Sequence, residues 1–291
     1  MKKSCNILWF RRDLRLDDNA ALYHALKGEL PVLPLFIFDQ TILAQLPKDD
    51  ARVTFIYEAI EKLKSALQKQ GSDLLVKYGK PEKIWPEVLE EYEVKAVYTN
   101  RDYEPYARER DDQVAEFLTS EKIAFFTYKD QVIFEKNEVL KADGTPYTVF
   151  TPYYKQWQAK LNNFYFKPYP GQKYYKNLFQ TKHLPIPTLA NMGFEKSEQQ
   201  FPKLSYQTKL EHYAKERDFP ALDSTTHIGI HLRFGTLSIR KAVADALEHK
   251  SYVWLSELAW REFYMMILWH FPYSAFGSFK RQYDKIRWRN N

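Results

Sequence analysis

The sequence has almost none of the residues that build covalent or metal-held folds. Cys5 is the only cysteine among 291 residues. This excludes an internal disulfide framework and any multi-cysteine zinc or iron–sulfur site. The thiol lies in an apolar run, which predicts ordinary core packing. Any redox chemistry would therefore need a bound cofactor.

Glycine is also scarce, with nine residues in the whole chain. None of them forms a GxGxxG pattern after the first apolar run or a Walker-type phosphate loop. An ordinary dinucleotide or kinase-type site is therefore not expected in the first half of the chain.

Long hydrophobic runs are missing as well. No stretch approaches the roughly 18 apolar residues of a membrane-spanning helix. The first ten residues, MKKSCNILWF, pass from two lysines into a strand-like run without a cleavable signal pattern. We expect a cytoplasmic monomer that does not associate with a membrane.

Positive charge and tryptophan are concentrated near the end of the chain. The formal net charge is +6, and residues 206–291 hold 13 Lys and Arg against 9 Asp and Glu. Four of the seven tryptophans, Trp254, Trp260, Trp269 and Trp288, lie in the same segment. Cations interleaved with flat rings favour binding to nucleic-acid bases. The alternative is a large aromatic core, since most aromatic side chains are buried for packing.

The first 130 residues alternate between two periodicities. Short apolar runs predict strands at 6–10, 32–38, 73–78, 94–100 and 123–128. Helical patterns separate them, such as residues 51–70, which Gly71 terminates. This series predicts an α/β fold, a Rossmann-like parallel sheet with helices on both faces. Ligands of such sheets lie beyond the carboxyl ends of the strands, here 11–17, Asp39 and 100–106.

The composition and periodicity of the sequence change twice after the predicted sheet. Residues 135–205 are rich in proline and tyrosine and predict a long linker. Helical spacing resumes near Thr208 and continues through the last third. We therefore divide the chain into an α/β domain (1–134), a linker (135–205) and the first helices of an all-α domain (206–291).

A charged stretch, WFRRDLRLDDNAAL at 9–22, follows the first predicted strand. Asn19 is placed to cap a helix that begins at Ala20. A salt-bridged surface loop is one interpretation. However, the stretch resembles the opening motif of the DNA photolyase and cryptochrome family. FTPYYKQW (150–157) resembles the linker motif of the same family. YAKERDFP…DSTTHIGIHLRFGTLSIR (213–240) and WLSELAWREFY (254–264) resemble the start of its flavin-binding helical domain.

The segment 223–229 precedes a predicted helix, whose free N–H groups could bind phosphate with help from the Thr225 and Thr226 hydroxyls. Simple N-capping by Ser224 or a threonine is the alternative. The resemblance implies FAD as the cofactor. Its implied contacts are Tyr213, Thr225, Thr226, His227, Ile228, Gly229, Trp254 and Arg261. Family members usually carry serine at the position of Gly229 and proline at that of Ile230.

Residues 254–264 place three aromatic and two charged side chains on one face. At 100° per residue, Trp254, Glu257, Trp260, Arg261 and Tyr264 fall within an arc of about 120°. Glu257 and Arg261 could form an ordinary i, i+4 pair. The resemblance instead implies that this face receives a flipped pyrimidine dimer.

In that reading each of these side chains has a role. Trp260 stacks on the dimer, Glu257 hydrogen-bonds its bases, and Trp254 and Arg261 line the flavin and DNA wall. Arg217 contacts DNA phosphate, and Trp288 belongs to a tryptophan electron-transfer chain. A core or base-stacking position is the alternative for Trp288.

The resemblance implies a light-driven lyase that repairs cyclobutane pyrimidine dimers in DNA with reduced FAD. A cryptochrome-type photoreceptor and a flavin-free nucleic-acid-binding α/β protein are the alternatives. The chain stops before the later helices of the family, so we expect a fragment. Some relatives bind a folate antenna through an Asn–Glu pair where this chain has Tyr106 and Ala107, which leaves the presence and identity of an antenna open.

Overall fold

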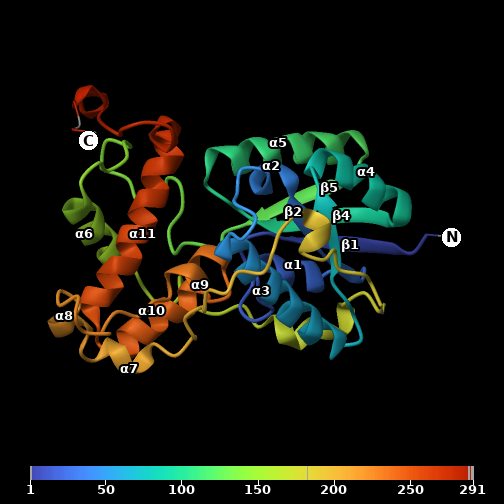
Figure 1. Ribbon diagram of the computed structural model, residues 1–291, viewed down its shortest axis with the longest axis horizontal. Coiled ribbons are helices and arrows are strands. Elements are labelled where there is room, and N and C mark those ends of the chain that lie inside the picture. Colours follow the sequence, from blue (N-terminus) through green and yellow to red (C-terminus); the bar gives the residue numbers. More distant parts are fainter. Residues whose placement is uncertain (1, 182, 288, 290–291) are drawn as a thin grey trace.

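The structure is a computed structural model that describes residues 2–181, 183–287 and 289. Within them, one five-stranded sheet is flanked and followed by helices (Figure 1). The strands are β1 (Ser4–Phe10), β2 (Val32–Asp39), β3 (Leu75–Gly79), β4 (Glu93–Asn100) and β5 (Ala124–Tyr128). The α-helices are α1 (Ala20–Leu26), α2 (Gln40–Leu43), α3 (Ala51–Gln68), α4 (Pro81–Glu91), α5 (Pro105–Ser120), α6 (Phe150–Lys160), α7 (Gln207–Leu210), α8 (Tyr213–Glu216), α9 (Gly229–Phe234), α10 (Ile239–Glu248) and α11 (Tyr252–His270). Short 3-10 helices are η1 (Gly171–Asn177), η2 (Ala190–Met192), η3 (Pro272–Ala275) and η4 (Arg281–Lys285).

All strand pairs in the sheet are parallel, in the order β3-β2-β1-β4-β5. The chain builds outward from β1 to β3 and then crosses to β4 on the other side of β1. The strand order therefore reverses between β1 and β4, the place where open α/β sheets form a crevice. The predicted fold class is confirmed, and each predicted strand lies within two residues of the observed one at either end.

The alternation of side chains along β1 divides the core into two layers. Leu8 and Phe10 pack with α1 and α3 on one face. Ile7 and Trp9 pack with α4 and α5 on the other, because successive side chains of a strand point to opposite faces. Cys5 lies in this second layer and is fully buried, as predicted.

Asn19, which precedes α1, links this helix to the carboxyl ends of β1 and β4. Its side-chain oxygen accepts a hydrogen bond from Leu22 N at 3.0 Å and caps α1, as predicted. The amide nitrogen donates to Asp13 Oδ2 at 3.0 Å, and Asn100 Nδ2 donates to Asn19 Oδ1 at 2.8 Å. The cap is therefore part of a buried network that ties the β1 and β4 ends together.

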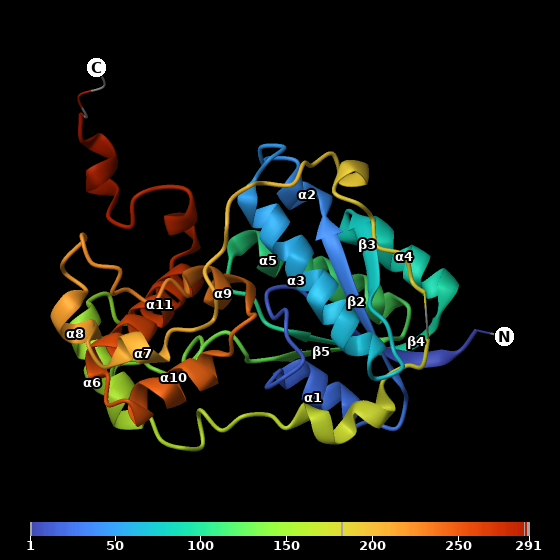
Figure 2. The same ribbon diagram turned by 60° about the horizontal axis from the view of Figure 1, so that its bottom comes forward.

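The segment 135–205 is packed against both halves of the molecule. Tyr153 and Trp157 of α6 enter the helical core beside α11. Leu178 and Met192 join the core that covers the α1 and α3 face of the sheet. Figure 2 shows this segment running from the helical end of the molecule back along the sheet. The domain boundaries at 134 and 205 stay predictions, but this linker is a packed strap.

The helices of the last third form a second core around α10 and α11. The helical spacing predicted from Thr208 onward is interrupted at first: α7 and α8 are single turns, and the backbone at His212, with φ −105° and ψ −7°, departs from regular helical geometry. Both views place this helical unit and the end of the chain away from the N-terminus (Figures 1 and 2).

Buried ion pairs hold the helical unit against the sheet. Arg240 of α10 donates to Asp18 Oδ1 at 2.8 Å and to Asp130 Oδ1 at 2.7 Å. Arg15 donates to the other Asp130 oxygen at 2.7 Å. Although burial raises the pKa of Asp130, the adjacent guanidinium groups lower it below its usual value. The loop after β1 is thereby fixed to α10.

Candidate functional site

The predicted face of α11 is present, and its two borders are covered by neighbouring segments. Trp254, at one border, is 2% exposed, and its indole N–H donates to Thr226 Oγ1 at 3.2 Å. Trp260, at the other border, packs against α6. Tyr264 and Glu257 lie between the borders, and Tyr264 is 62% exposed. This follows from the 120° arc, because only its centre points away from both neighbours.

Glu257 forms its ion pair with Arg217, the residue that follows α8, rather than within α11. Arg217 donates to its carboxylate, and both side chains keep about a third of their surface exposed. The Arg217 guanidinium also lies 5.6 Å from the centre of the Tyr213 ring. The i, i+4 pair with Arg261 considered from the sequence is absent from the described side-chain contacts. Three predicted site residues, Tyr213, Arg217 and Glu257, are thus brought together.

Trp260 lies in a ladder of aromatic rings between α6 and α11. Its ring stacks on Phe150 with centroids 3.6 Å apart and planes at 11°. Tyr264, one turn further along α11, stacks on Trp260 with ring centroids 5.5 Å apart and planes at 24°. Tyr154 continues the ladder beyond Phe150. The ladder fixes the orientation of the Trp260 indole through stacking contacts with both Phe150 and Tyr264.

Arg261 points into the junction between the two halves of the molecule. It donates to the backbone oxygens of Gln131 at 2.6 Å and Leu232 at 3.1 Å. Burial of the guanidinium, followed by repulsion from Arg12, lowers its pKa to about 10. Arg261 therefore lies apart from Glu257 and binds the segments before α6 and within α9.

The predicted phosphate loop is an exposed turn ahead of α9. Thr225 and His227 are exposed, and His227 has a left-handed φ of 52°. Its Nε2 lies 2.7 Å from Asp223 Oδ1, and Lys209 donates to the Thr225 carbonyl at 2.9 Å. The capping alternative is not formed, because Ser224 donates to Glu216 and no side chain caps α9.

Two further predicted contacts flank this turn. Ile228 is buried in the helical core, whereas Gly229 is exposed. A Cβ built on Gly229 would meet no atom within 4 Å, so the backbone there is open to a ligand. Trp288 lies outside the described residues.

Glu262 is a central residue that sequence reasoning missed. It is 2% exposed, and its carboxylate accepts from Ile133 N at 2.6 Å, Phe134 N at 2.9 Å and Trp157 Nε1 at 2.7 Å. Burial raises its pKa to about 7 despite these donors. The available signal was a glutamate whose neighbours three and four residues away on the helix are all apolar, because buried carboxylates need dedicated partners.

A cavity of about 700 Å³ opens where the sequence placed ligands, at the carboxyl ends of the strands. Asp39 accepts a hydrogen bond from Tyr106 Oη at 2.7 Å, and Arg110 lies over the Trp9 ring at 5.0 Å. Asp102, at the same edge, is buried. Burial opposes its ionisation, but Arg12 and Arg11 lower its pKa to about 2. The wall combines aromatic rings, fixed negative charge and guanidinium groups. None of the predicted flavin or DNA contacts lines it.

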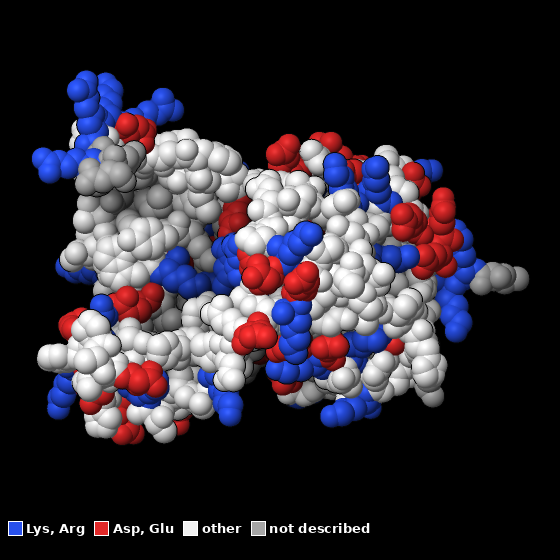
Figure 3. All heavy atoms as spheres, in the orientation of Figure 1, with Lys and Arg blue, Asp and Glu red and all other residues white. Residues whose placement is uncertain are grey.

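The surface in Figure 3 carries basic side chains in the hollow between the helical unit and the sheet-containing unit. Over the sheet-containing half of the same face, acidic and basic groups alternate. In the described part of the chain, no helix is both long and apolar enough to span a bilayer. The described side chains also hold no group of three or more His, Cys, Asp or Glu residues placed for a metal ion.

Comparison with known proteins gives a consistent result. A family model described as DNA photolyase matches residues 6–173. A deoxyribodipyrimidine photo-lyase of Synechococcus is 31% identical, with 98% of this chain and 64% of the relative aligned. Among solved structures, a class III photolyase from Agrobacterium tumefaciens superposes with a TM-score of 0.83 at 26% identity, covering 100% of this chain and 64% of that one.

A photolyase from Sulfolobus tokodaii, solved with two FAD molecules, superposes with a TM-score of 0.80 at 27% identity. The alignment covers 99% of this chain and 64% of that chain. The chain thus spans about 64% of the length of the photolyases described here.

Proposed function

Since the chain belongs to the DNA photolyase family, we propose that it serves light-driven repair of cyclobutane pyrimidine dimers in DNA. The observation that carries this proposal is the alignment of nearly the whole chain with photolyases of known structure, including the α11 region. The reaction is a carbon–carbon bond cleavage, which makes the proposed enzyme a lyase.

The residues of the helical unit fit one end of a flavin dinucleotide. The exposed turn 223–229 offers the Thr225 hydroxyl, an uncovered backbone at Gly229 and the uncapped first N–H groups of α9. Backbone N–H groups of this kind suit phosphate oxygens. Tyr213 and Trp254 would pack near the ring system. When bound and reduced, FAD would supply the electron that opens the dimer under light.

The α11 face supports the proposed handling of DNA. The Arg217 and Glu257 pair remains partly exposed, so both groups can exchange their mutual contact for polar groups of a nucleotide. Trp260 is held in a fixed orientation by Phe150, and a flat ring of this kind can stack on an extruded base. Basic side chains in the adjacent hollow suit the phosphate backbone (Figure 3).

The cavity at the carboxyl edge of the sheet supports a second chromophore in this proposal. Its size of about 700 Å³ lies within the range of cofactor sites. Tyr106 is engaged with Asp39 and Ala107 is 5% exposed, so the Asn–Glu pair that some relatives use for folate is replaced. We infer an antenna other than a folate bound in that manner.

The proposal is tested with purified protein that has been shown to hold reduced flavin. Illumination with blue light in the presence of an oligonucleotide containing thymine dimers should remove the dimers. The dimers that remain are measured by chromatography of the digested DNA. A dark sample of the same mixture is the control. Unchanged dimers after illumination would reject the lyase and leave the photoreceptor reading. Protein without flavin absorbance would reject both.

A further inference from the structure

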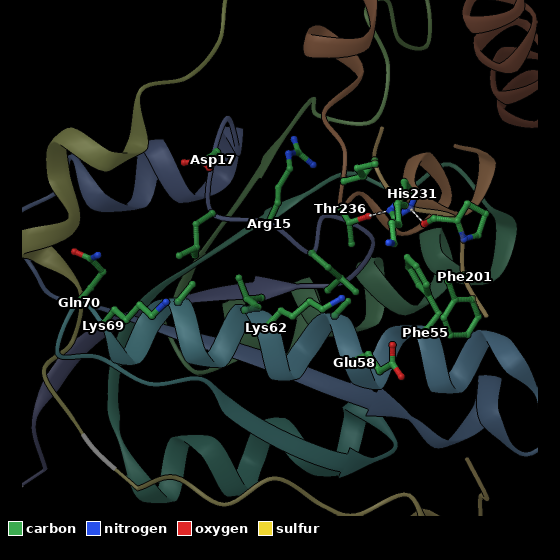
Figure 4. A pocket seen from close by; sticks show the side chains of 18 of the residues that line it. Arg15, Asp17, Phe55, Glu58, Lys62, Lys69, Gln70, Phe201, His231 and Thr236 are labelled. Atoms are coloured by element: carbon green, nitrogen blue, oxygen red, sulfur yellow. Dashed lines mark hydrogen bonds between the residues drawn. The ribbon is translucent and has the colours of Figure 1, made fainter. Parts of the chain in front are cut away.

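A second cavity, of about 720 Å³, lies on the other side of α3, away from the predicted flavin and DNA contacts. Its walls come from the loop after β1, from α3, from the strap near Phe201 and from His231 and Thr236 at α9 (Figure 4). Four separate stretches of the chain therefore meet around one space of the size that organic ligands occupy.

One end of this cavity is aromatic. Phe55 of α3 and Phe201 of the strap meet edge to face, with centroids 5.2 Å apart and planes at 78°. His231 lies against Phe55 with centroids 5.3 Å apart. Figure 4 shows Phe55 and Phe201 side by side at this end, below His231. Rings at the end of a cavity favour a flat apolar group.

Beyond the aromatic end, the lining includes three lysines, and these outnumber the two lining carboxylates, Asp17 and Glu58. Lys62, Lys69 and Lys203 form no ion pair among the described side chains. Glu58, the acidic group on the same stretch of α3, is already paired with Lys196 at 3.2 Å. Burial, followed by the Lys62 charge, lowers the pKa of His231. The local potential therefore favours a negatively charged ligand.

The spacing along α3 defines the length of the ligand. Phe55 and Lys62 are separated by seven residues, which is about 10 Å at 1.5 Å per residue. Lys69 lies about another 10 Å along the helix. Figure 4 shows Lys62 and Lys69 rising from the same side of α3 toward the loop that carries Arg15 and Asp17. A flat group at Phe55 would thus have its anionic groups at Lys62 and beyond.

We propose that this cavity is a binding site for a nucleotide, with the heterocyclic base against Phe55 and Phe201 and the phosphates at Lys62 and Lys69. A nucleotide has the required flat ring, elongated shape and several negative charges. Because the cavity is built from α3, the strap and α9, bound ligand stabilises the contact among them. The site shares no residue with the predicted flavin and DNA contacts, so it stands without the proposed repair activity.

Isothermal titration calorimetry with ADP, adenosine and inorganic phosphate as separate probes tests the site. ADP should bind most tightly, and adenosine at least tenfold more weakly. The double variant Lys62→Glu and Lys69→Glu should weaken ADP binding at least tenfold, whereas Lys83→Glu on α4, also an exposed lysine, should leave it unchanged. No binding of ADP, or equal loss in both variants, would overturn the proposal.

A filled cavity gives an independent test. Ala66 lines the cavity and is only partly buried, so Ala66→Trp occupies the space without entering the core of the sheet. Ser65→Trp, one residue away and exposed outside this cavity, is the matched control. ADP should raise the melting temperature of the wild type and the control but not of Ala66→Trp. An equal rise in all three proteins would place ADP elsewhere and reject the site.

Discussion

Gly235 ends α9 where the helical unit meets the loop after β1. Its φ is +67°, and a Cβ there would collide with the Arg12 carbonyl oxygen and lie 2.5 Å from Asp13 Cα. Backbone atoms cannot move aside as a flexible side chain can. The residue therefore permits a close approach that only glycine allows.

Gly235→Ala should lower the free energy of unfolding by about 3 kcal/mol or more, from left-handed strain and backbone overlap together. Gly193→Ala is the control, since Gly193 has a similar φ of +83° with no atom within 4 Å of its Cβ. It should cost only about 1 kcal/mol. Urea unfolding of the two variants measures the difference, and equal losses would show that the close approach is unimportant.

The raised pKa of Glu262 leads us to expect that the stability of the protein depends on pH. Its pKa of about 7 in the folded protein exceeds the usual value of 4.5. Its contribution to stability is therefore complete below pH 4.5 and is lost as the pH rises through 7, because the folded state then loses a proton that it binds preferentially. The rise in pKa from 4.5 to about 7 corresponds to about 3 kcal/mol of folding free energy that is lost over this pH range.

Glu262→Gln should remove this dependence while lowering stability at every pH, since an amide cannot accept from all the same donors. Unfolding by urea at pH 5 and pH 8 should show the wild type losing more stability over this interval than the variant. Equal pH slopes in the two proteins would indicate that Glu262 is ionised throughout.

Trp260 gives a prediction for the proposed repair. Trp260→Ala should weaken preference for dimer-containing over undamaged oligonucleotide by about tenfold, because stacking on a base contributes about 1 to 3 kcal/mol. Flavin retention should be largely unaffected. Phe150→Leu, which disturbs the ladder but keeps the indole, should reduce the preference less. Fluorescence anisotropy with both oligonucleotides measures it, and unchanged preference in Trp260→Ala would contradict the stacking role.

At the scale of elements, the side chains that cap α1 and α3 differ in what surrounds them. Asn19 caps α1 and also bonds to Asp13 and Asn100 in a fully buried network. Asp50 caps α3 through Arg52 N at 2.8 Å near the surface. The first cap joins a helix to the sheet, and the second serves its helix alone.

Asn19→Ala should therefore cost about 3 kcal/mol, because it removes the cap and also leaves buried partners unpaired. Asp50→Ala should cost about 1 kcal/mol, as an ordinary cap does. Circular dichroism during chemical unfolding compares the two variants. If both lose the same free energy, the buried network adds nothing to the cap.

Across the whole molecule, the sheet and the helical unit are joined by Arg240 and its two carboxylates. Removing one partner of a buried ion pair leaves uncompensated charge, which typically costs 3 to 5 kcal/mol. Arg15 still pairs with Asp130 when Arg240 is absent. The cost therefore falls mainly on Asp18, which loses its ion pair with Arg240.

Arg240→Met should weaken the contact between the two units enough to separate their unfolding in scanning calorimetry into two transitions. Lys241→Met is the control: the Lys241 side chain, next to Arg240 in the sequence, is 58% exposed and pairs with Asp245, so the change should be below about 1 kcal/mol. A single transition at an unchanged temperature in Arg240→Met would show that other contacts unite the molecule.

The sequence anticipated local features whose causes are local. The five strands and the helix ending near Gly71 follow from periodicity and backbone preference, and Asn19 from the chemistry of caps. The α11 face followed from the helical repeat, which fixes which side chains share a direction. The motifs at 9–22 and 213–264 indicated the family before any coordinates, and the comparisons confirmed it.

Partner choice was decided by the tertiary structure. Glu257 contacts Arg217, which lies 40 residues earlier in the chain, and Arg261 binds backbone of the loop on the sheet side, although the i, i+4 spacing also allowed a pair between Glu257 and Arg261. Glu262 and the strap around the sheet were likewise hidden, because ion pairs and cores join residues far apart in the chain. Periodicity determines the direction of a side chain on its own element; packing between elements determines what it meets.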